Sequence, residues 1–248
     1  MGKALIFYIG LHHPSDACHF ERACISINCL KTRKKPLCAR LLIDSGAFTE
    51  VVRHGGYRSD VADYARQLLR LAGGIAEIDA AVAQDYMCED IALQSTGLTI
   101  ADHQRLTIER YDRLIDEELP CPIMPVLQGY EPDDYARHAE AYGERLGFGL
   151  WTGVGSICKR NGRPNAIIGV LRAIRRVRPD LRLHGFGLKS TALAHIGIRE
   201  LLASADSMAW SYAARREGRN ANSWLEAKTF AERVSEVPAD LFYGRDRQ

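Results

Sequence analysis

Short apolar runs alternate with amphipathic runs along most of this chain, and that alternation constrains its fold more than any other feature. Eight runs have the length and composition of buried strands, and the last six are each followed by a helical pattern. Strands and helices in strict alternation indicate a parallel sheet, and eight such units predict an α/β fold, a (β/α)8 TIM-like barrel with an irregular start. An open doubly wound sheet is the alternative. The strand-like runs are 5–9, 23–28, 41–44, 78–83, 122–127, 150–154, 181–186 and 205–211.

Capping residues indicate where several helices begin. Asp60 precedes an amphipathic run, and Thr99 with Asp102 three positions later forms a capping-box pattern for a helix that extends to about 119. Pro132 suits the first turn of another helix. Further helical patterns span 165–177, 191–202 and 224–234.

The length of 248 residues is that of one such barrel, so we expect a single domain over 1–248. Within it, 1–40 forms irregular N-terminal strands and a loop, 41–220 carries the motifs with chemistry, and 221–248 forms a closing helix and tail. The N-terminal apolar run is too short to span a bilayer and lacks a cleavage site, so we expect a cytoplasmic protein that does not bind a membrane. Seven cysteines without a Cys-x-x-Cys pair favour reduced thiols.

Polar residues recur where the predicted strands end. Asp44, Asp85, Gln128 and His184 stand at or near the ends of four strands, and Asp206 lies within the last. The carboxyl ends of barrel strands converge on one face, where the active sites of this fold lie. We therefore expect these five residues in one pocket.

Two carboxylates from separate strands, Asp44 and Asp206, suit acid–base or nucleophilic chemistry at a glycosidic carbon. A carboxylate within an apolar strand is costly to desolvate unless it has partners or a task. For either aspartate alone, a role as a cap or turn residue is the alternative.

A second group of residues suits the binding of a flat base. Asp85 with Gln128 supplies acceptors and a donor for the amide and amino edge of a purine. Gly153 and Gly155 allow a close approach of the backbone to such a ligand, and Phe48 is a stacking candidate.

Five segments of the chain carry a further pattern: 84–89, 126–129, 153–158, 183–189 and 206–215. In order and wording, these segments resemble the tRNA-guanine transglycosylase superfamily. They are most similar to its compact phage and bacterial branch, which is associated with deazapurine modification of DNA, and the similarity covers about 41–220. It implies an enzyme that replaces guanine in a polynucleotide, DNA rather than tRNA, with a 7-deazaguanine such as the 7-cyano form, and releases guanine. The target base must be extruded for this exchange.

The resemblance also implies roles for individual residues. Asp206 is expected to be the nucleophile at C1′, and Asp44 to exchange protons with the departing and incoming bases. Lys189 is expected to neutralise a phosphate or to pair with Asp206, with an ordinary surface lysine as the alternative. The remaining expected base-binding residues are Ser45, Asp85, Gln128 and the backbone of 153–155 at the base edge, Phe48 by stacking, and His184 over the opposite face.

The chain departs from the larger members of the superfamily in two respects. No Cys follows Cys158 and no His follows His195, so their structural zinc is not expected here, and the sequence indicates no other metal or cofactor. The N-terminal His and Cys residues at 12–38 match no metal-binding spacing that we recognise. The tail after Trp224 is too short for an added RNA-binding domain, which favours DNA as the partner.

Several alternatives remain open at the level of sequence. A tRNA substrate, an N-glycosidase that leaves abasic sites, and a barrel that binds DNA without catalysis all fit parts of the pattern. A homodimer is compatible with the sequence, which carries no signal for the oligomeric state. We expect phosphate contacts from the basic clusters at 31–35 and 215–219, and a solvated helix face for the basic residues at 172–182.

Overall fold

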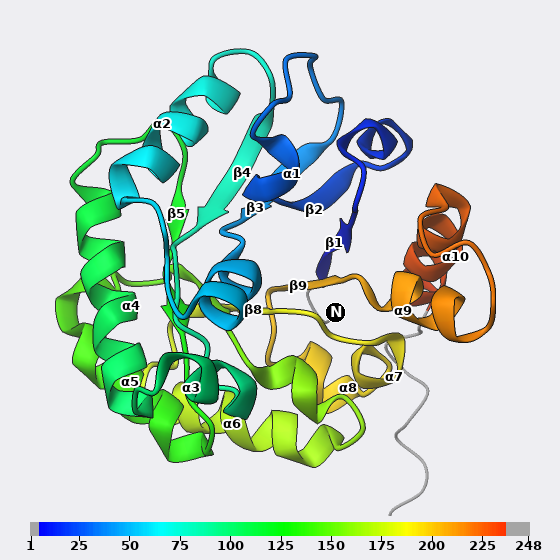
Figure 1. Cartoon of the computed structure of the whole chain (residues 1–248). Coiled ribbons are helices and arrows are strands. Elements are labelled where there is room, and N and C mark those ends of the chain that lie inside the picture. The colour runs from blue at the N-terminus through cyan, green and yellow to red at the C-terminus, as the bar shows by residue number, and fades with distance from the viewer. Residues whose placement is uncertain (1–4, 237–248) are drawn as a thin grey trace, which may run out of the picture.

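The computed structural model describes residues 5–236. These residues form one parallel, nearly closed barrel that is surrounded by helices (Figure 1). The strands follow the order β5-β4-β3-β2-β1-β9-β8-β7-β6, and every pairing is parallel. The predicted barrel is therefore confirmed, and the open doubly wound sheet was wrong. The strands are β1 (Ile6–Gly10), β2 (Arg22–Ser26), β3 (Arg40–Asp44), β4 (Glu77–Val82), β5 (Ile123–Met124), β6 (Val126–Leu127), β7 (Trp151–Val154), β8 (Arg182–Gly185) and β9 (Ser204–Ser207).

The barrel closes through the short stretch that contains β5 and β6. These are two halves of the single strand expected at 122–127, and Pro125 separates them. Proline has no N–H to donate to a strand ladder, so the pairing changes partner at this point. Met124 pairs with Val82 of β4, whereas Leu127 pairs with Val154 of β7. One interrupted strand thus joins the two ends of the sheet.

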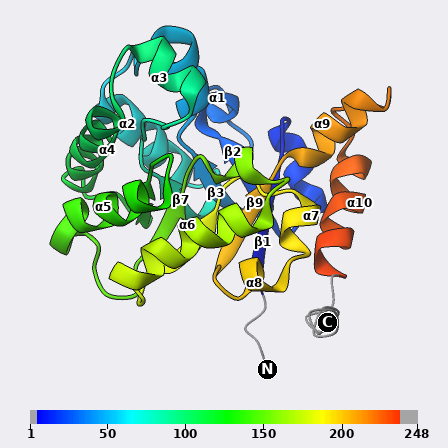
Figure 2. The ribbon, with the colours of Figure 1, turned by 90° about the horizontal axis from the view of Figure 1, so that it is seen from below.

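Ten helices surround the strands within the described residues, and their caps agree with the sequence. Asp60 caps α2, and Thr99 with Asp102 forms the expected capping box of α4. Figure 2 shows α9 and α10 side by side at one end of the molecule. The helices are α1 (Ile27–Leu30), α2 (Val61–Ala72), α3 (Asp90–Thr96), α4 (Ile100–Ile115), α5 (Pro132–Tyr142), α6 (Pro164–Val177), α7 (Ser190–Leu193), α8 (Ile196–Arg199), α9 (Ala209–Arg216) and α10 (Trp224–Ser235).

Some boundaries differ from the sequence-based expectation. The strand expected at 205–211 ends at Ser207, and its apolar continuation forms α9, which buries Trp210 and Ala214 one helical turn apart. A short apolar run fits both periodicities, so periodicity alone does not separate strand from helix there. The helix expected at 191–202 is two short helices, and α4 ends at Ile115 rather than near 119.

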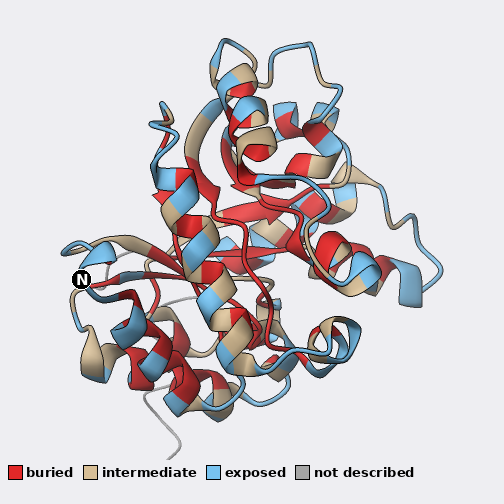
Figure 3. Ribbon diagram, turned by 60° about the vertical axis from the view of Figure 1, so that its left-hand side comes forward, coloured by how far each residue is buried: buried red, intermediate tan, exposed pale blue. Residues whose placement is uncertain are grey.

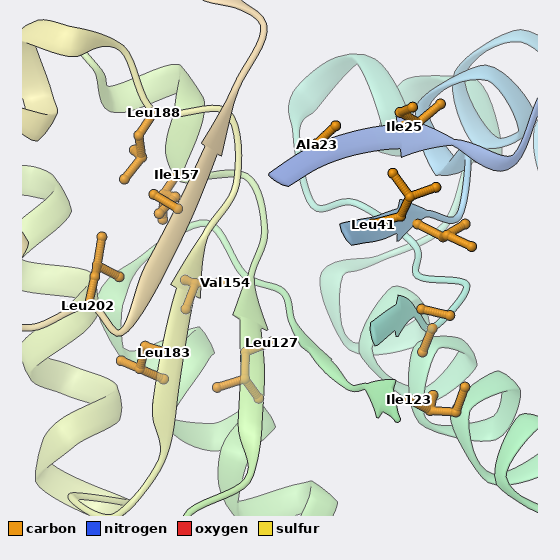
Figure 4. Close-up of a cluster of buried hydrophobic side chains, with 14 of the residues drawn as sticks. Ala23, Ile25, Leu41, Ile123, Leu127, Val154, Ile157, Leu183, Leu188 and Leu202 are labelled. Atoms are coloured by element: carbon orange, nitrogen blue, oxygen red, sulfur yellow. The ribbon is translucent and has the colours of Figure 1, made fainter. Parts of the chain in front are cut away.

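Apolar side chains alternate between two cores along the strands. Leu42 lies inside the barrel, whereas Leu41 and Ile43 face the helices. Figure 3 shows the buried strands at the centre, with helices that are buried on one face and exposed on the other. Figure 4 shows side chains of the outer core, among them Ile25, Leu41 and Leu183. The inner core consists of Tyr8, Cys24, Leu42, Ala80, Val82, Met124 and Val126.

The last helix, α10, covers the outer face of β1. A 3-10 turn at Pro14–His19, rather than an α-helix, follows β1. Phe230 of α10 packs on Phe7 with ring centres 6.1 Å apart, and Trp224 stacks on His19 at 3.8 Å. The expected closing helix therefore supplies the cover that the start of the barrel lacks, while the tail expected after it lies mostly outside the described residues.

Replacing Phe230 with alanine should destabilise the protein by about 3 kcal/mol, because a buried aromatic ring leaves a cavity against β1. Phe230 is 9% exposed, whereas Leu225 on the same helix is 57% exposed. Leu225→Ala should change the unfolding free energy by no more than about 0.5 kcal/mol. Urea denaturation of both variants measures the difference, and equal losses would contradict the role of the Phe230 ring as an anchor.

Candidate active site

Asp206 lies on β9 near the carboxyl end of the barrel and is 9% exposed. Its Oδ1 atom accepts a hydrogen bond from the backbone N–H of Gly187 at 3.0 Å and lies 3.3 Å from Nε2 of His184. Among the described residues, the side chain that contacts the Asp206 carboxylate is thus His184, and Lys189, the partner expected from the sequence, forms no ion pair with it. The ammonium of Lys189 instead lies 5.6 Å from the centre of the Tyr212 ring.

Asp44 ends β3, and the turn after it holds its carboxylate. The backbone N–H of Gly46 donates to Oδ2 of Asp44 at 3.0 Å. Gly46 has φ +76°, and a Cβ at this position would lie 2.4 Å from Nδ2 of Asn28, so the turn requires glycine. Desolvation by the surrounding protein raises the pKa of Asp44, and the negative charge of Asp206 raises it further.

The two carboxylates act on the same interior region of the barrel. Two strands, β1 and β2, separate β9 from β3 in the sheet. Cys24 of β2 lies in the inner core, and its thiol pKa is raised first by burial and then by the charges of Asp206 and Asp44. The Cys24 thiol therefore lies close enough to both carboxylates for each charge to raise its pKa.

The residues expected to read a base edge form one buried network. Nε2 of Gln128 donates to Oδ2 of Asp85, and the Ser45 hydroxyl donates to Oδ1 of Asp85 at 3.4 Å. The Ser156 hydroxyl donates to Oε1 of Gln128 at 2.9 Å. Tyr57 donates its hydroxyl to the backbone oxygen of Asp85 at 3.1 Å. In this structure the polar groups of the network satisfy one another.

The two glycines of β7 and its following loop make room for neighbouring side chains. A Cβ at Gly155 would lie 2.1 Å from Nε2 of Gln128, and a Cβ at Gly153 would lie 2.3 Å from the Phe186 ring. Phe186 in turn meets His184 edge to face, with ring centres 4.7 Å apart. Both glycines are therefore needed for the packing of the site, and their backbone contact with a ligand stays a prediction.

The other expected binding residues occupy different depths. His184 is fully buried, and its ring contacts Asp206 and Phe186. Its expected place over the face of the base stays a prediction. Phe48 is 52% exposed at the first position of a π-helical turn, Phe48–Val52. Lys189 is exposed in the loop after β8. Phe48 and Lys189 are thus exposed to solvent, and their expected contacts with a base and with phosphate stay predictions.

Two pockets flank the network of Asp85 and Gln128. One, of about 350 Å³, is lined by Ser45 and Tyr57 among others, and the second, of about 300 Å³, by Ser156 and Tyr130 among others. Neither pocket is lined by Asp44 or Asp206. Ser45 lines one pocket and Ser156 the other, so the hydrogen bonds through Asp85 and Gln128 connect the linings of the two pockets.

Residues in two of the three basic clusters form ion pairs with neighbouring carboxylates. In the cluster at 172–182, Arg176 pairs with Asp133 and Arg178 with Asp180, as expected for a solvated helix face. In the cluster at 215–219, Arg219 pairs with Glu217 and Glu226. Lys31 of the N-terminal cluster lines the larger pocket. Phosphate contacts from the two outer clusters stay a prediction.

The N-terminal His and Cys residues are dispersed in the fold. His19 stacks on Trp224, Cys24 lies inside the barrel, and Cys18, Cys29 and Cys38 are exposed. Within residues 5–236, no three His, Cys, Asp or Glu side chains come together as metal ligands would. Over the same residues, none of the helices has the length and apolar character that a membrane crossing requires.

Sequence reasoning missed several residues of the site. Ser204 stands two positions before Asp206, and period 2 places both side chains on one face of the strand, so that signal was available. Phe186 lies within the segment 183–189, which carries the resemblance. Tyr57 is in a loop distant from every motif, and no pattern in the sequence marks it.

The fold and these residues define the chain as a TIM-type barrel protein with buried carboxyl groups gathered at the carboxyl ends of its strands. A family model described as DpdA, DeoxyPurine in DNA protein A, matches residues 5–225. The match spans most of the chain, which therefore belongs to this family of DNA-guanine transglycosylases in deazapurine DNA modification. Among curated proteins, no match was found.

Asp85 should make the stability of the protein depend on pH. Burial raises its pKa to about 7, and the charge of Asp44 contributes, while an unfolded aspartate titrates near about 3.9. The folded protein therefore holds this proton more tightly, so the contribution to stability is complete at low pH and is lost as pH rises towards 7. Wild-type protein should lose roughly 2 kcal/mol more than Asp85→Asn between about pH 5 and about pH 8.

Urea denaturation at the two pH values measures this difference. Asp116→Asn is the matched control, because Asp116 is exposed beyond the end of α4. Parallel pH profiles for wild-type protein and Asp85→Asn would contradict the assignment.

Proposed function

We propose that this chain exchanges guanine in DNA for a 7-deazaguanine, such as the 7-cyano form, through a covalent intermediate on Asp206. The observation that carries the proposal is the placement of Asp44 and Asp206 at the carboxyl ends of their barrel strands, together with the buried hydrogen bond between Gln128 and Asp85. Family membership supports the substrate class, since the family is one of DNA-guanine transglycosylases.

In the first half of the reaction, a carboxylate oxygen of Asp206 attacks C1′ of the target deoxyguanosine. The C1′–N9 bond breaks, its electron pair leaves with guanine, and an ester between Asp206 and C1′ remains. In the second half, N9 of the incoming base attacks the same carbon and displaces Asp206. Two displacements at one carbon retain its configuration.

Asp44 moves the proton that each half requires. Its raised pKa keeps the carboxyl protonated to higher pH than an ordinary aspartate, so it can supply a proton to the departing guanine. The resulting carboxylate then accepts the proton from N9 of the incoming base. Charge repulsion from Asp206 favours the protonated form of Asp44 while Asp206 is a free carboxylate, and that repulsion falls when the ester forms.

Recognition of the base is assigned to the network described above. The carboxylate of Asp85 accepts from the N–H groups at the guanine edge, and Gln128 offers both a donor and an acceptor. Ser45 and the backbone of 153–155 complete this edge, Phe48 stacks on the face of the base, and Lys189 at the rim attracts the phosphate backbone.

Incubation with labelled 7-cyano-7-deazaguanine tests the exchange, with duplex DNA, single-stranded DNA and tRNA in parallel. We expect label in DNA, and a protein–DNA adduct that survives denaturation. Asp206→Ala should abolish both, because no nucleophile remains. Asp116→Ala should leave both unchanged, since Asp116 is exposed beyond the end of α4, at the opposite end of the barrel.

Three results would contradict the proposal. Abasic sites without any incorporated label would show a glycosidase, and label confined to tRNA would show a different polynucleotide substrate. Retention of DNA without an adduct in the wild-type protein would indicate a binding module.

Phe48→Ala should raise the KM for the base about 10-fold, because one stacking contact is lost. The unfolding free energy should change by less than about 0.5 kcal/mol, since half of the ring is exposed. Phe148→Ala is the matched control: that ring is 95% exposed in the loop before β7, on the opposite face of the barrel. Steady-state kinetics with labelled base compare the two, and equal KM values would contradict a stacking role.

A further inference from the structure

A chain of hydrogen bonds runs through the barrel interior to the carboxylate of Asp206. Nε1 of Trp151 donates to Oγ of Ser204 at 2.7 Å, and that oxygen lies 2.8 Å from Nδ1 of His184. Nε2 of the same imidazole lies 3.3 Å from Oδ1 of Asp206. Ser204 and His184 are buried almost completely, so the bonds between them exclude solvent.

The barrel itself brings these four residues together. Ser204 and Asp206 share the inner face of β9 because they stand two positions apart. His184 of β8 is the register partner of Ser204. Trp151 begins β7, the neighbour of β8 on its other side, and its ring packs against the inner core.

The positions of the protons follow from what each group is able to donate. An indole Nε1 only donates, so Ser204 accepts from Trp151. The hydroxyl of Ser204 carries one hydrogen, and within residues 5–236 its other partner is Nδ1 of His184. If Nδ1 donated instead, the buried O–H of Ser204 would have no acceptor among the described residues, and an unpaired buried donor is costly. Nδ1 is therefore the acceptor of this bond, and a neutral imidazole then carries its hydrogen on Nε2, facing Asp206.

The two oxygens of Asp206 differ as a result. Oδ1 accepts from the Gly187 N–H and from Nε2–H of His184. Oδ2 has no hydrogen-bond partner among the described residues. It is also not fully enclosed, since the enclosed side-chain atoms without a hydrogen bond in this part of the chain belong to Glu89 and His195. The two donors fix the carboxylate plane, and Oδ2 stays free.

We propose that Trp151, Ser204 and His184 are positioning residues for Asp206. Trp151 and Ser204 hold His184 in its neutral Nε2–H form, and His184 thereby aims Oδ2 of Asp206 at the sugar carbon. The role of Oδ2 rests on the proposed function, whereas the state of His184 does not. After attack by Oδ2, Oδ1 becomes the ester carbonyl oxygen. When the incoming base displaces Asp206, negative charge returns to Oδ1, where both donors already point.

Nuclear magnetic resonance tests the state of His184 without any reaction. Long-range ¹H–¹⁵N correlations on the full chain labelled with ¹⁵N-histidine distinguish the two neutral forms from imidazolium, and the signal absent from His184→Gln identifies the residue. We expect the Nε2–H form in wild-type protein near about pH 7.5 and a mixture of neutral forms in Ser204→Ala. An Nδ1–H form or an imidazolium in wild-type protein would overturn the inference.

Single-turnover formation of the DNA adduct tests the positioning role. His184→Leu removes the donor and should slow the adduct roughly 10- to 100-fold, with DNA affinity unchanged. His184→Gln keeps an N–H near the position of Nε2 and should restore most of the rate. Equal rates for His184→Leu and wild-type protein, or no rescue by glutamine in a folded variant, would overturn the role.

The two measurements separate this inference from the proposed function. A wild-type protein that forms no adduct but shows the Nε2–H form would contradict the reaction and leave the hydrogen-bond chain intact. An active wild-type protein with the other form would contradict the chain alone. Should His184→Leu unfold, Ser204→Ala supplies the same kinetic comparison, since it removes only the group that selects the form of His184.

Discussion

The pairing change at Pro125 is the constraint on which the candidate site depends. A strand normally keeps the same partner along its length. Here the residues before the proline pair with β4, and the residues after it pair with β7. This junction fixes the distance between the end of β4, where Asp85 follows, and the end of β6, where Gln128 follows. The Gln128–Asp85 hydrogen bond is a consequence of how the barrel closes.

Buried carboxyl groups are the second constraint, because each is costly to desolvate unless the protein compensates. The structure treats the three aspartates differently. Asp206 receives two donors on one oxygen, Asp44 receives one backbone N–H, and Asp85 receives side-chain donors on both oxygens. Burial nevertheless raises the pKa values of Asp44 and Asp85. Groups that differ in proton affinity within one site suit different tasks.

The architecture was predictable from sequence because strand and helix periodicities repeat over the whole chain. The caps at Asp60 and Thr99 were also predictable, since capping depends on local backbone geometry alone. Periodicity failed at 205–211, where the apolar positions fit a strand as well as the first turn of α9. It also gave no sign that Pro125 would divide a strand between two partners.

The candidate site was predictable in part for the same reason. Polar residues at strand ends converge in any parallel barrel, so Asp44, Asp85 and Gln128 could be grouped before their contacts were known. The contacts themselves depend on side-chain rotamers and on loops. Tyr57 reaches Asp85 from a loop, and His184 turns towards Asp206 because Ser204 stands beside it on the next strand. Neither contact follows from position along the chain.

In the proposed base exchange, the mutual satisfaction of Gln128, Asp85 and Ser156 has a consequence for selectivity between nucleobases. An entering base must replace the hydrogen bonds that these side chains make with one another. Only a base with a matching edge then leaves no buried polar group unpaired. Adenine presents a lone pair where guanine presents N1–H, and its contact with an ionised Asp85 would be repulsive as well as unpaired. Each such mismatch costs about 1–3 kcal/mol, so the network as proposed would disfavour adenine before any bond to the sugar is broken.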